Sequence, residues 1–263
     1  MLLSDKQLEI GPGIRARIIL LMDASRFSKT TWAAIPDLHG CHRAAMGAVK
    51  WLQENHLNAV FLGDYCDRGE SSILTVDALI DAREKNPHWK FLMGNHEQAL
   101  LRAWHENSES APFQMERTAF EEYQLDPEVK PKHLPFYQSL LPYFETESLL
   151  FCHGGVQKSF DKKISDVPLD ELLWSYYVHP NWQGKKIIRG HAVVEKPLED
   201  ENSISCETGV WLPEGNLAIC LIEDDRSRKG PRLLGWQTVS KFGEIGKFYE
   251  FSAAMTSDAA SGR

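Results

Sequence analysis

The sequence predicts a single α/β domain built on a largely parallel β-sheet, and three observations lead to that fold class. The chain has 263 residues, which is enough for one large α/β domain with a substantial core. Short apolar segments alternate with amphipathic ones, as βαβ crossovers require. The loops that follow the apolar segments carry acidic residues and histidines, and this is where open α/β sheets bind their ligands.

The composition indicates a soluble protein of a reducing compartment. Apolar residues make up 43% of the chain and charged residues 25%, which is ordinary for a globular domain. A net charge of −8 argues against a broad nucleic-acid or membrane surface, although it leaves room for a small basic pocket. The five cysteines have no C-x-x-C spacing, so we expect free thiols and a cytoplasmic location. No apolar run approaches the roughly 20 residues that span a bilayer.

The first half of the chain shows the alternation of strands and helices most clearly. Residues 1–30 are expected to be an N-terminal extension with one edge strand at 16–22. Apolar periodicity then predicts a strand at 31–35, a helix at 41–54, a strand at 59–62, a helix from Ser71 or Ser72 to 86, a strand at 89–93 and a third helix through Leu100, Leu101 and Trp104.

The second half is less regular. Residues 107–135 are polar and contain several prolines, so we expect a loop and helical insertion that covers the site as a lid. The elements predicted after it are a strand at 148–152, a helix at 169–174, a strand at 186–189 and antiparallel strands at 203–207, 216–223 and 232–239. The domain thus covers residues 1–251, and 252–263 is expected to be a flexible tail.

Five predicted loops share one arrangement, in which an apolar strand and a tight turn precede side chains that bind metals. These loops contain Asp37-x-His39, Asp64-x-x-Asp67-Arg68, Asn95-His96-Glu97, His153 and His191. Each one alone is better explained as a polar surface turn or a structural histidine, so the inference depends on all five. If the strands lie in one sheet, the loops gather along a single edge. Carboxylate, amide and imidazole ligands together suit manganese, iron or zinc better than calcium or magnesium.

In chain order these loops read D-x-H-G, G-D-x-x-D-R-G, G-N-H-E, H-G-G and G-H. This ordered set resembles the calcineurin-like metallophosphoesterases, and specifically bacterial-type members of the serine/threonine (PPP-type) phosphoprotein-phosphatase branch. The resemblance extends from Ile35 to about Leu221. It implies a four-layer α/β/β/α sandwich, in which helices flank two β-sheets and a dinuclear metal site lies along one edge.

The resemblance also implies a set of metal ligands. One metal would be held by Asp37, His39 and Asp64, and the second by Asp64, Asn95, His153 and His191, with Asp64 bridging the two. The cofactors would be two divalent metal ions, with manganese preferred and iron or zinc as alternatives. Metals about 3.5–4 Å apart would share a hydroxide that attacks a phosphate monoester in line.

The remaining matched residues would act on the substrate. By the resemblance, His96 protonates the leaving group as a general acid. Asp67 accepts a hydrogen bond from the other N–H of the His96 ring. Arg68 and Asn95 bind the phosphoryl group, for which the planar guanidinium of Arg68 is suited. The simpler alternative for Asp67 is a structural salt bridge with Arg68.

The sequence departs from the family pattern in four places. Pro36 precedes Asp37 where the family has glycine, Met93 replaces an arginine, Ser175-Tyr176-Tyr177 stand where bacterial relatives commonly have an arginine, and Ala192 replaces threonine. We therefore expect intact metal ligands but weaker or altered binding of the substrate phosphate. The arginines that could compensate are Arg43, Arg102, Arg117 and Arg189.

Two further groups of residues have a structural and a functional interpretation. Cys66 and Cys152 lie in ligand-bearing loops, and we prefer small buried side chains to an oxidation-sensitive site. Trp174, Tyr176 and Tyr177 could stack on an aromatic leaving group or base, but core packing is the preferred interpretation.

These observations support three candidate functions. The leading one is a phosphomonoesterase that acts on a phosphoprotein or a small phosphorylated molecule. The second is symmetrical cleavage of diadenosine tetraphosphate, because the same motifs occur in those hydrolases. The third is a metal-binding pseudophosphatase scaffold. None of these predicts a nucleic-acid or membrane partner, and the sequence leaves the oligomeric state open.

Overall fold

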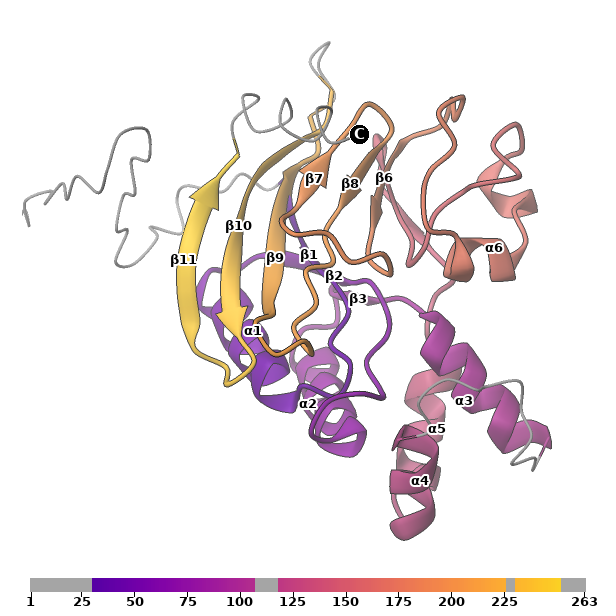
Figure 1. Ribbon diagram of the computed structural model, residues 1–263, viewed down its shortest axis with the longest axis vertical. Helices are drawn as coiled ribbons and strands as arrows, with labels where there is room; N and C mark the ends of the chain where they lie inside the picture. The colour runs from indigo at the N-terminus through magenta and orange to yellow at the C-terminus, as the bar shows by residue number, and fades with distance from the viewer. Residues whose placement is uncertain (1–29, 107–117, 226–229, 252–263) are drawn as a thin grey trace, which may run out of the picture.

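A computed structural model describes residues 30–106, 118–225 and 230–251. Two β-sheets pack face to face, and helices cover their outer faces (Figure 1). The predicted α/β class and the four-layer arrangement are confirmed. The strand expected at 16–22 and the tail expected at 252–263 lie outside the described residues.

The first sheet has six strands in the order β11-β10-β9-β1-β2-β3. They are β1 (Thr31–Ile35), β2 (Asn58–Phe61), β3 (Lys90–Phe91), β9 (Asn216–Glu223), β10 (Arg232–Ser240) and β11 (Ile245–Glu250). Strands β1, β2 and β3 are parallel, whereas β9 runs antiparallel to β1 and continues into the antiparallel pairs with β10 and β11. The sheet is therefore mixed rather than largely parallel.

The second sheet has five strands in the order β4-β5-β6-β8-β7. They are β4 (Phe144–Glu145), β5 (Leu149–Phe151), β6 (Lys186–Arg189), β7 (Leu198–Glu199) and β8 (Ser203–Ser205). The prediction that 203–207 joins an antiparallel region holds on one side only, because β8 pairs antiparallel with β7 but in parallel with β6. The two edge strands, β4 and β7, are antiparallel to their neighbours.

Six α-helices are described, namely α1 (His42–Glu54), α2 (Ser72–Lys85), α3 (Asn95–Glu106), α4 (Thr118–Leu125), α5 (Lys130–Gln138) and α6 (Leu169–Trp174). Ser71 caps α2, since its hydroxyl accepts a hydrogen bond from the backbone N–H of Leu74. The described part of the segment 107–135 forms α4 and the beginning of α5, and both helices contact α2 and α3.

Three apolar layers hold the sandwich together. Ala33 and Ile35 of β1 face α1, while Ala34 between them faces the second sheet. The layer between the sheets includes Val60, Leu62, Phe151, Ile188 and Ile204. A third layer joins the second sheet to α6 through Leu150, Ile187 and Leu172. Because the central strands are buried on both faces, their sequences read as continuous apolar runs, and each large apolar side chain that is fully buried contributes about 1.5–3 kcal/mol.

Candidate active site

The five predicted loops converge, but they come from both sheets rather than from one. The loops after β1, β2 and β3 belong to the first sheet, and those after β5 and β6 to the second. Within the first sheet, the carbonyl of Asp64 accepts the backbone N–H of His39 (2.8 Å). Between the sheets, Asp37 Oδ1 accepts the backbone N–H of His191 (3.1 Å). The candidate site therefore lies at the junction of the two sheets.

The backbone around this junction is strained and tightly packed. Non-glycine residues with positive φ are rare, yet five of them lie in the site loops: His39, Asp64, Asp67, Arg68 and His191. A side chain at Gly94 would collide with Asp64 Oδ1, and one at Gly190 would collide with Asp37 Oδ1. Strain of this kind persists where the surrounding structure holds it, and it is concentrated at functional sites.

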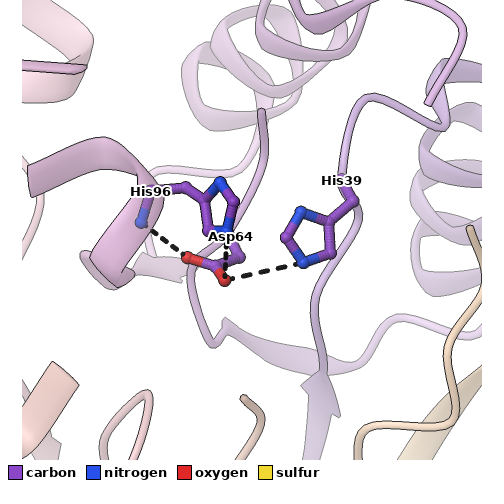
Figure 2. Close-up of side chains that lie close together, drawn as sticks. All are labelled: His39, Asp64 and His96. Atoms are coloured by element: carbon purple, nitrogen blue, oxygen red, sulfur yellow. Dashed lines mark hydrogen bonds and ion pairs between the residues drawn. The ribbon is translucent and has the colours of Figure 1, made fainter. Parts of the chain in front are cut away.

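Asp64 is the centre of the cluster, as Figure 2 shows for its contacts with His39 and His96. Its Oδ1 accepts the backbone N–H of His96 (3.1 Å), which leaves Oδ2 to face three imidazoles. The distances from Oδ2 are 3.3 Å to His153 Nε2, 3.6 Å to His39 Nε2 and 3.9 Å to His96 Nε2. Burial opposes ionisation, but these neighbours, His153 first, hold the pKa of Asp64 well below its usual value.

The first group of candidate ligands contains Asp37, His39 and Asp64. His39 Nδ1 donates to the carbonyl of Cys66 (3.0 Å), so its Nε2 carries the lone pair that faces the cluster. Asp37 Oδ2 lies 3.8 Å from that nitrogen. Burial raises the pKa of Asp37 to about 7, although His153 opposes the shift. A positive charge placed between these atoms would relieve the cost of burying the carboxylates.

The tightest arrangement on this side of the cluster includes His96. His39, Asp64 and His96 bring one ligand atom each within 4.8 Å of one another, and Asp37 is not part of this group. His96 is therefore a second candidate ligand at the first position, in addition to its expected role as an acid.

The second group contains Asp64, Asn95, His153 and His191. His153 Nδ1 donates to the carbonyl of Leu62 (2.9 Å), and its Nε2 lies 2.8 Å from Asn95 Oδ1 and 3.2 Å from His191 Nδ1. Burial lowers the pKa of both imidazoles, but Asp64 and Asp37 raise that of His153 to about 9, whereas His153 helps to lower that of His191 to about 3.

The chemistry of this second group fits a metal ion. Carboxylate and amide oxygens and imidazole nitrogens converge on one point, and they form the mixed ligand set that manganese, iron and zinc accept. Two buried atoms of the group, Asn95 Nδ2 and His191 Nε2, have no hydrogen-bond partner among the described residues. Buried polar atoms rarely lack partners in a protein that has no ligand to bind.

His96 and Asp67 form the shortest charged pair of the cluster, with 2.6 Å between His96 Nδ1 and Asp67 Oδ2. Asp67 Oδ1 accepts hydrogen bonds from the backbone N–H of Ala119 (2.8 Å) and from the hydroxyl of Thr118 (3.2 Å). Burial lowers the pKa of His96, but Asp64 and Asp67 outweigh it and raise that pKa above its usual value. His96 Nε2 is buried, and among the described residues it has no hydrogen-bond partner.

Arg68 lies on the His39 side of the cluster. Its Nη1 donates to His39 Nε2 (3.0 Å), and its guanidinium carbon lies 4.2 Å above the ring of Trp211. This cation–π contact holds the guanidinium beside the candidate ligands. Trp211 was not among the predicted site residues, because a tryptophan outside the motifs carries no signal of its own.

The other arginines considered as substitutes are placed elsewhere. Arg189 is buried, and its Nη1 donates to the carbonyl of Gly154 (3.4 Å), so it supports the loop behind His153. Arg102 forms an ion pair with Asp170 (3.0 Å). Arg43 is exposed on α1, and Arg117 lies outside the described residues.

Two buried glutamates hold the ligand loops and were not predicted to do so. Glu97, which the sequence groups with the ligands, accepts the backbone N–H of Asp64 (2.8 Å) and of Tyr65 (2.8 Å). Glu207 accepts the backbone N–H of Asp37 (3.0 Å). Burial raises the pKa of both glutamates, with Asp64 adding to the shift of Glu97 and Asp37 to that of Glu207. A glutamate that follows a short strand is the only signal that could have identified Glu207.

The two cysteines of the ligand-bearing loops are buried, whereas the two tyrosines that follow α6 are exposed. Cys66 and Cys152 are fully buried, as preferred. The prediction of core packing is wrong for Tyr176 and Tyr177, which are 63% and 47% exposed. Trp174 is partly buried and donates from Nε1 to Gln98 Oε1 (3.2 Å).

Comparison with known proteins places this geometry in a family. A family profile described as calcineurin-like phosphoesterase matches residues 31–215. A protein of Bacillus velezensis named asymmetrical bis(5′-nucleosyl)-tetraphosphatase PrpE is 25% identical over 206 residues, which cover 66% of this chain and 82% of the relative. The protein of the same name from Bacillus subtilis is 24% identical over 206 residues, which cover 66% of this chain and 84% of the relative.

Solved structures share the fold at low sequence identity. A putative diadenosine tetraphosphatase aligns with a TM-score of 0.53 and 14% identity over 78% of this chain and 94% of its own. A protein serine/threonine phosphatase from Saccharomyces cerevisiae aligns with a TM-score of 0.52 and 13% identity over 86% and 82% of the two chains. At these identities the likeness concerns the fold.

Proposed function

The chain belongs to the calcineurin-like phosphoesterase family, and from that premise we propose that it is a dinuclear metal hydrolase that cleaves dinucleoside tetraphosphates asymmetrically. Family membership makes it a phosphoester hydrolase. The observation that carries the dinuclear proposal is the position of Asp64 Oδ2, which faces His39 on one side and His153 on the other.

The proposed ligands divide between two metal positions. One would be held by Asp37, His39 and Asp64, and the other by Asp64, Asn95, His153 and His191. Divalent cations bound there would supply a solvent nucleophile of lowered pKa and would offset charge on the phosphoryl oxygens. Manganese is our first choice, with iron or zinc as alternatives.

The remaining proposed steps belong to the side chains. His96 would deliver the proton to the leaving oxygen, because Asp67 keeps its ring charged and oriented while Nε2 faces the cluster. Arg68 and Asn95 would bind the phosphoryl group, with Trp211 holding the guanidinium in place. If His96 is instead a metal ligand at the first position, its replacement will remove a metal as well as activity.

The choice of substrate follows the relatives rather than the motifs. The motifs alone favour a phosphate monoester first and symmetrical dinucleotide cleavage second. Four relatives of 23–25% identity are all named asymmetrical bis(5′-nucleosyl)-tetraphosphatases. We therefore rank the dinucleotide first and expect unequal products, a nucleoside triphosphate and a monophosphate. A small phosphate monoester or a phosphoprotein remains the second candidate, which the phosphatase motifs favour.

One pair of assays tests this proposal. Metal-stripped protein is given diadenosine tetraphosphate or an aryl phosphate while Mn²⁺ is titrated back, and the products are separated by anion exchange. We expect ATP and AMP in equal amounts, and a far slower reaction of the aryl phosphate. Two molecules of ADP would show symmetrical cleavage, and a preference for the aryl phosphate would restore the monoesterase. No turnover of either substrate with two metals bound would indicate a scaffold.

His96→Asn separates the two roles considered for this residue. A general acid contributes about 10²–10⁴-fold to the rate, so we expect a loss of this size in kcat for the dinucleotide with two metals still bound. The metal content is measured by elemental analysis. Loss of one metal from the variant would make His96 a ligand and would overturn its assignment as the acid.

A further inference from the structure

Tyr176 presents an exposed aromatic ring at the edge of the candidate site. Its side chain is 63% exposed, and its ring centroid lies 4.7 Å from that of His191 at an interplanar angle of 40°. Most of this side chain is therefore open to solvent, next to a proposed metal ligand. Large aromatic rings bury much apolar surface when they stack, so an exposed ring beside a site is suited to contact with a ligand.

The backbone that carries Tyr176 is held firmly. Gly154 donates its N–H to the carbonyl of Leu172 (2.7 Å), and a side chain at Gly154 would come within 2.9 Å of the carbonyl of Ser175. Ser175 in turn donates its N–H to the carbonyl of Glu171 (3.1 Å). The loop of His153 and the end of α6 thus hold the backbone next to Tyr176 before any ligand arrives, which lowers the entropy cost of binding.

The chemistry around Tyr176 points to a flat, uncharged group as its ligand. The segment contains a serine and two tyrosines and no cationic side chain, so it does not add to the binding of phosphate. Trp211, on the His39 side of the cluster, differs from Tyr176 because the guanidinium of Arg68 covers its ring. Of these two aromatic residues, Tyr176 is the one that remains accessible to a stacking ligand.

We propose that Tyr176 is the stacking platform for one nucleobase of the substrate, with the attached phosphates directed toward Asp64 and His191. This inference rests on the proposed function and adds a specificity-determining residue to it. Stacking between a base and an aromatic ring strengthens binding by roughly 5- to 100-fold, and it tolerates different bases. A gain of this size distinguishes a nucleotide from a polyphosphate that has no base. The platform would thus select nucleotides over inorganic polyphosphate without selecting among purines.

Equilibrium binding to the metal-loaded protein tests the platform. The probes are a methylene-bridged, non-hydrolysable analogue of diadenosine tetraphosphate, inorganic tripolyphosphate and phenylphosphonate, each titrated calorimetrically. Tyr176→Ala removes the ring, Tyr176→Phe keeps it, and Tyr177→Ala is the matched control because that neighbouring tyrosine is also exposed.

We expect Tyr176→Ala to weaken binding of the dinucleotide analogue about 5- to 100-fold and to change binding of tripolyphosphate by less than about twofold. Tyr176→Phe and Tyr177→Ala should bind the analogue as the wild type does. The proposal is overturned if Tyr176→Ala binds the analogue normally, if it loses tripolyphosphate equally, or if it loses phenylphosphonate equally, since the last result would indicate a general aromatic contact.

The outcome can be separated from that of the proposed function. Turnover of diadenosine tetraphosphate by the wild-type protein is measured alongside the titrations. Turnover without a selective loss in Tyr176→Ala overturns the platform alone. A selective loss without turnover supports the platform and overturns the hydrolase that was proposed.

Discussion

Asp67 shows how much a single side chain determines at this site. One of its oxygens binds His96 at 2.6 Å, and the other accepts hydrogen bonds from Ala119 and Thr118. The alternative of a structural salt bridge to Arg68 predicts a different partner for this carboxylate. The observed pairing orients the imidazole and supplies a countercharge when it is protonated.

Asp67→Asn should therefore lower kcat while the metals stay bound. Asparagine carries no negative charge, and its NH₂ group would face either the Nδ1 proton of His96 or the backbone N–H of Ala119, so the charged ring loses its counter-ion. We expect a fall of about 10- to 100-fold, as is typical when the residue that orients a functional imidazole is removed, measured by steady-state kinetics with metal analysis.

The matched control is Asp77→Asn. Asp77 pairs with His133 at 2.9 Å, which is the same kind of contact between a carboxylate and an imidazole. That pair lies on α2 and α5 and has no place in the proposed mechanism, so kcat should not change. An equal fall in both variants would show a general loss of stability rather than a role for Asp67.

Glu97 is expected to determine stability rather than chemistry. Its two oxygens accept backbone hydrogen bonds from Asp64, Tyr65 and Gly94, and the side chain is fully buried. In Glu97→Gln the NH₂ group would face backbone N–H donors, which leaves at least one buried donor without a partner. We expect the free energy of unfolding to fall by about 1–3 kcal/mol in the metal-free protein.

Urea denaturation measures this change in the metal-free protein. Glu128→Gln, at an exposed position between α4 and α5, is the control and should unfold as the wild type does. An unchanged unfolding midpoint for Glu97→Gln would contradict the supporting role of this glutamate.

The sequence identified the candidate ligands because motifs keep them in fixed order, but it could not identify their supports. Asp37, Asp64 and His153 each follow an apolar strand, and that pattern can be read along the chain. Glu207 supports Asp37 across 170 residues, and nothing in local spacing links them. The exposure of Tyr176 also depends on how α6 packs. Its aromatic side chain follows an apolar stretch, and for that reason the prediction of core packing was wrong.

At the scale of elements, helix α4 links the predicted insertion segment to the loop of Asp67 and Arg68. Thr118 accepts the backbone N–H of Arg68 (3.1 Å) and donates to Asp67 Oδ1. Glu122, one turn later, accepts the backbone N–H groups of Ser72 and Ile73 at the start of α2. The helix thus fixes both ends of the segment between Asp67 and α2.

Thr118→Ala should reduce kcat moderately, because Asp67 loses one hydrogen bond and Arg68 another. At about 1 kcal/mol for a typical hydrogen bond, we expect a loss of about fivefold in kcat for each bond that matters in the transition state. Thr118→Ser keeps the hydroxyl and should restore the rate. If the serine variant is as slow as the alanine variant, packing of the methyl group and not hydrogen bonding explains the effect.

The carboxylate of Glu171 on helix α6 binds the backbone of the preceding loop. It accepts the backbone N–H groups of Gln157 (2.9 Å) and Ser159 (2.8 Å) and the hydroxyl of Ser159 (2.7 Å). Burial alone would raise the pKa of Glu171, but these hydrogen bonds outweigh it and lower the pKa below the usual 4.5. The ionised form is therefore favoured by folding.

A group whose pKa is lower in the folded protein contributes stability above its unfolded pKa and loses that contribution as the pH falls through the folded value. The difference in unfolding free energy between the wild type and Glu171→Gln should be largest near neutral pH and should shrink below about pH 4.5. Urea melts at several pH values measure it. Asp161→Asn, at an exposed position nearby, serves as the control, and a difference that grows toward acid pH would reverse the assigned sign.

The long elements were predictable and the short ones were not. Helix α2 has 14 residues, enough for one apolar face to be recognised, and the eight residues of β9 contain a continuous apolar run. Strands β4 and β7 have two residues each, and no period exists over so short a length. Strand β8 was predicted but grouped with β9 and β10, which belong to the other sheet, because pairing across a sheet depends on packing and not on the strand's own sequence.

At the scale of the whole molecule, the site is a junction between two independently hydrogen-bonded sheets. Backbone bonds run within each sheet, while the side chain of Asp37 and the ring of His153 contact backbone atoms of the opposite sheet's loops. Among the described residues, no helix is long and apolar enough to cross a membrane. The two sheets are joined by their shared apolar layer, by this polar junction and by other side-chain contacts, such as that of Glu199 on β7 with the backbone N–H of Leu233 on β10.

Metal binding at this junction should stabilise the whole fold, because it would join ligands from both sheets. A ligand that binds only the folded state at 100 times its Kd stabilises it by about 2.7 kcal/mol, which corresponds to a rise in melting temperature of about 5–10 °C for a domain of this size. Thermal melts of chelator-treated protein with Mn²⁺ titrated back measure the shift. Asp64→Asn should lose most of the shift, since both proposed metal positions share this carboxylate, whereas Asp77→Asn should keep it. An undiminished shift in Asp64→Asn would place the stabilising metal elsewhere in the molecule.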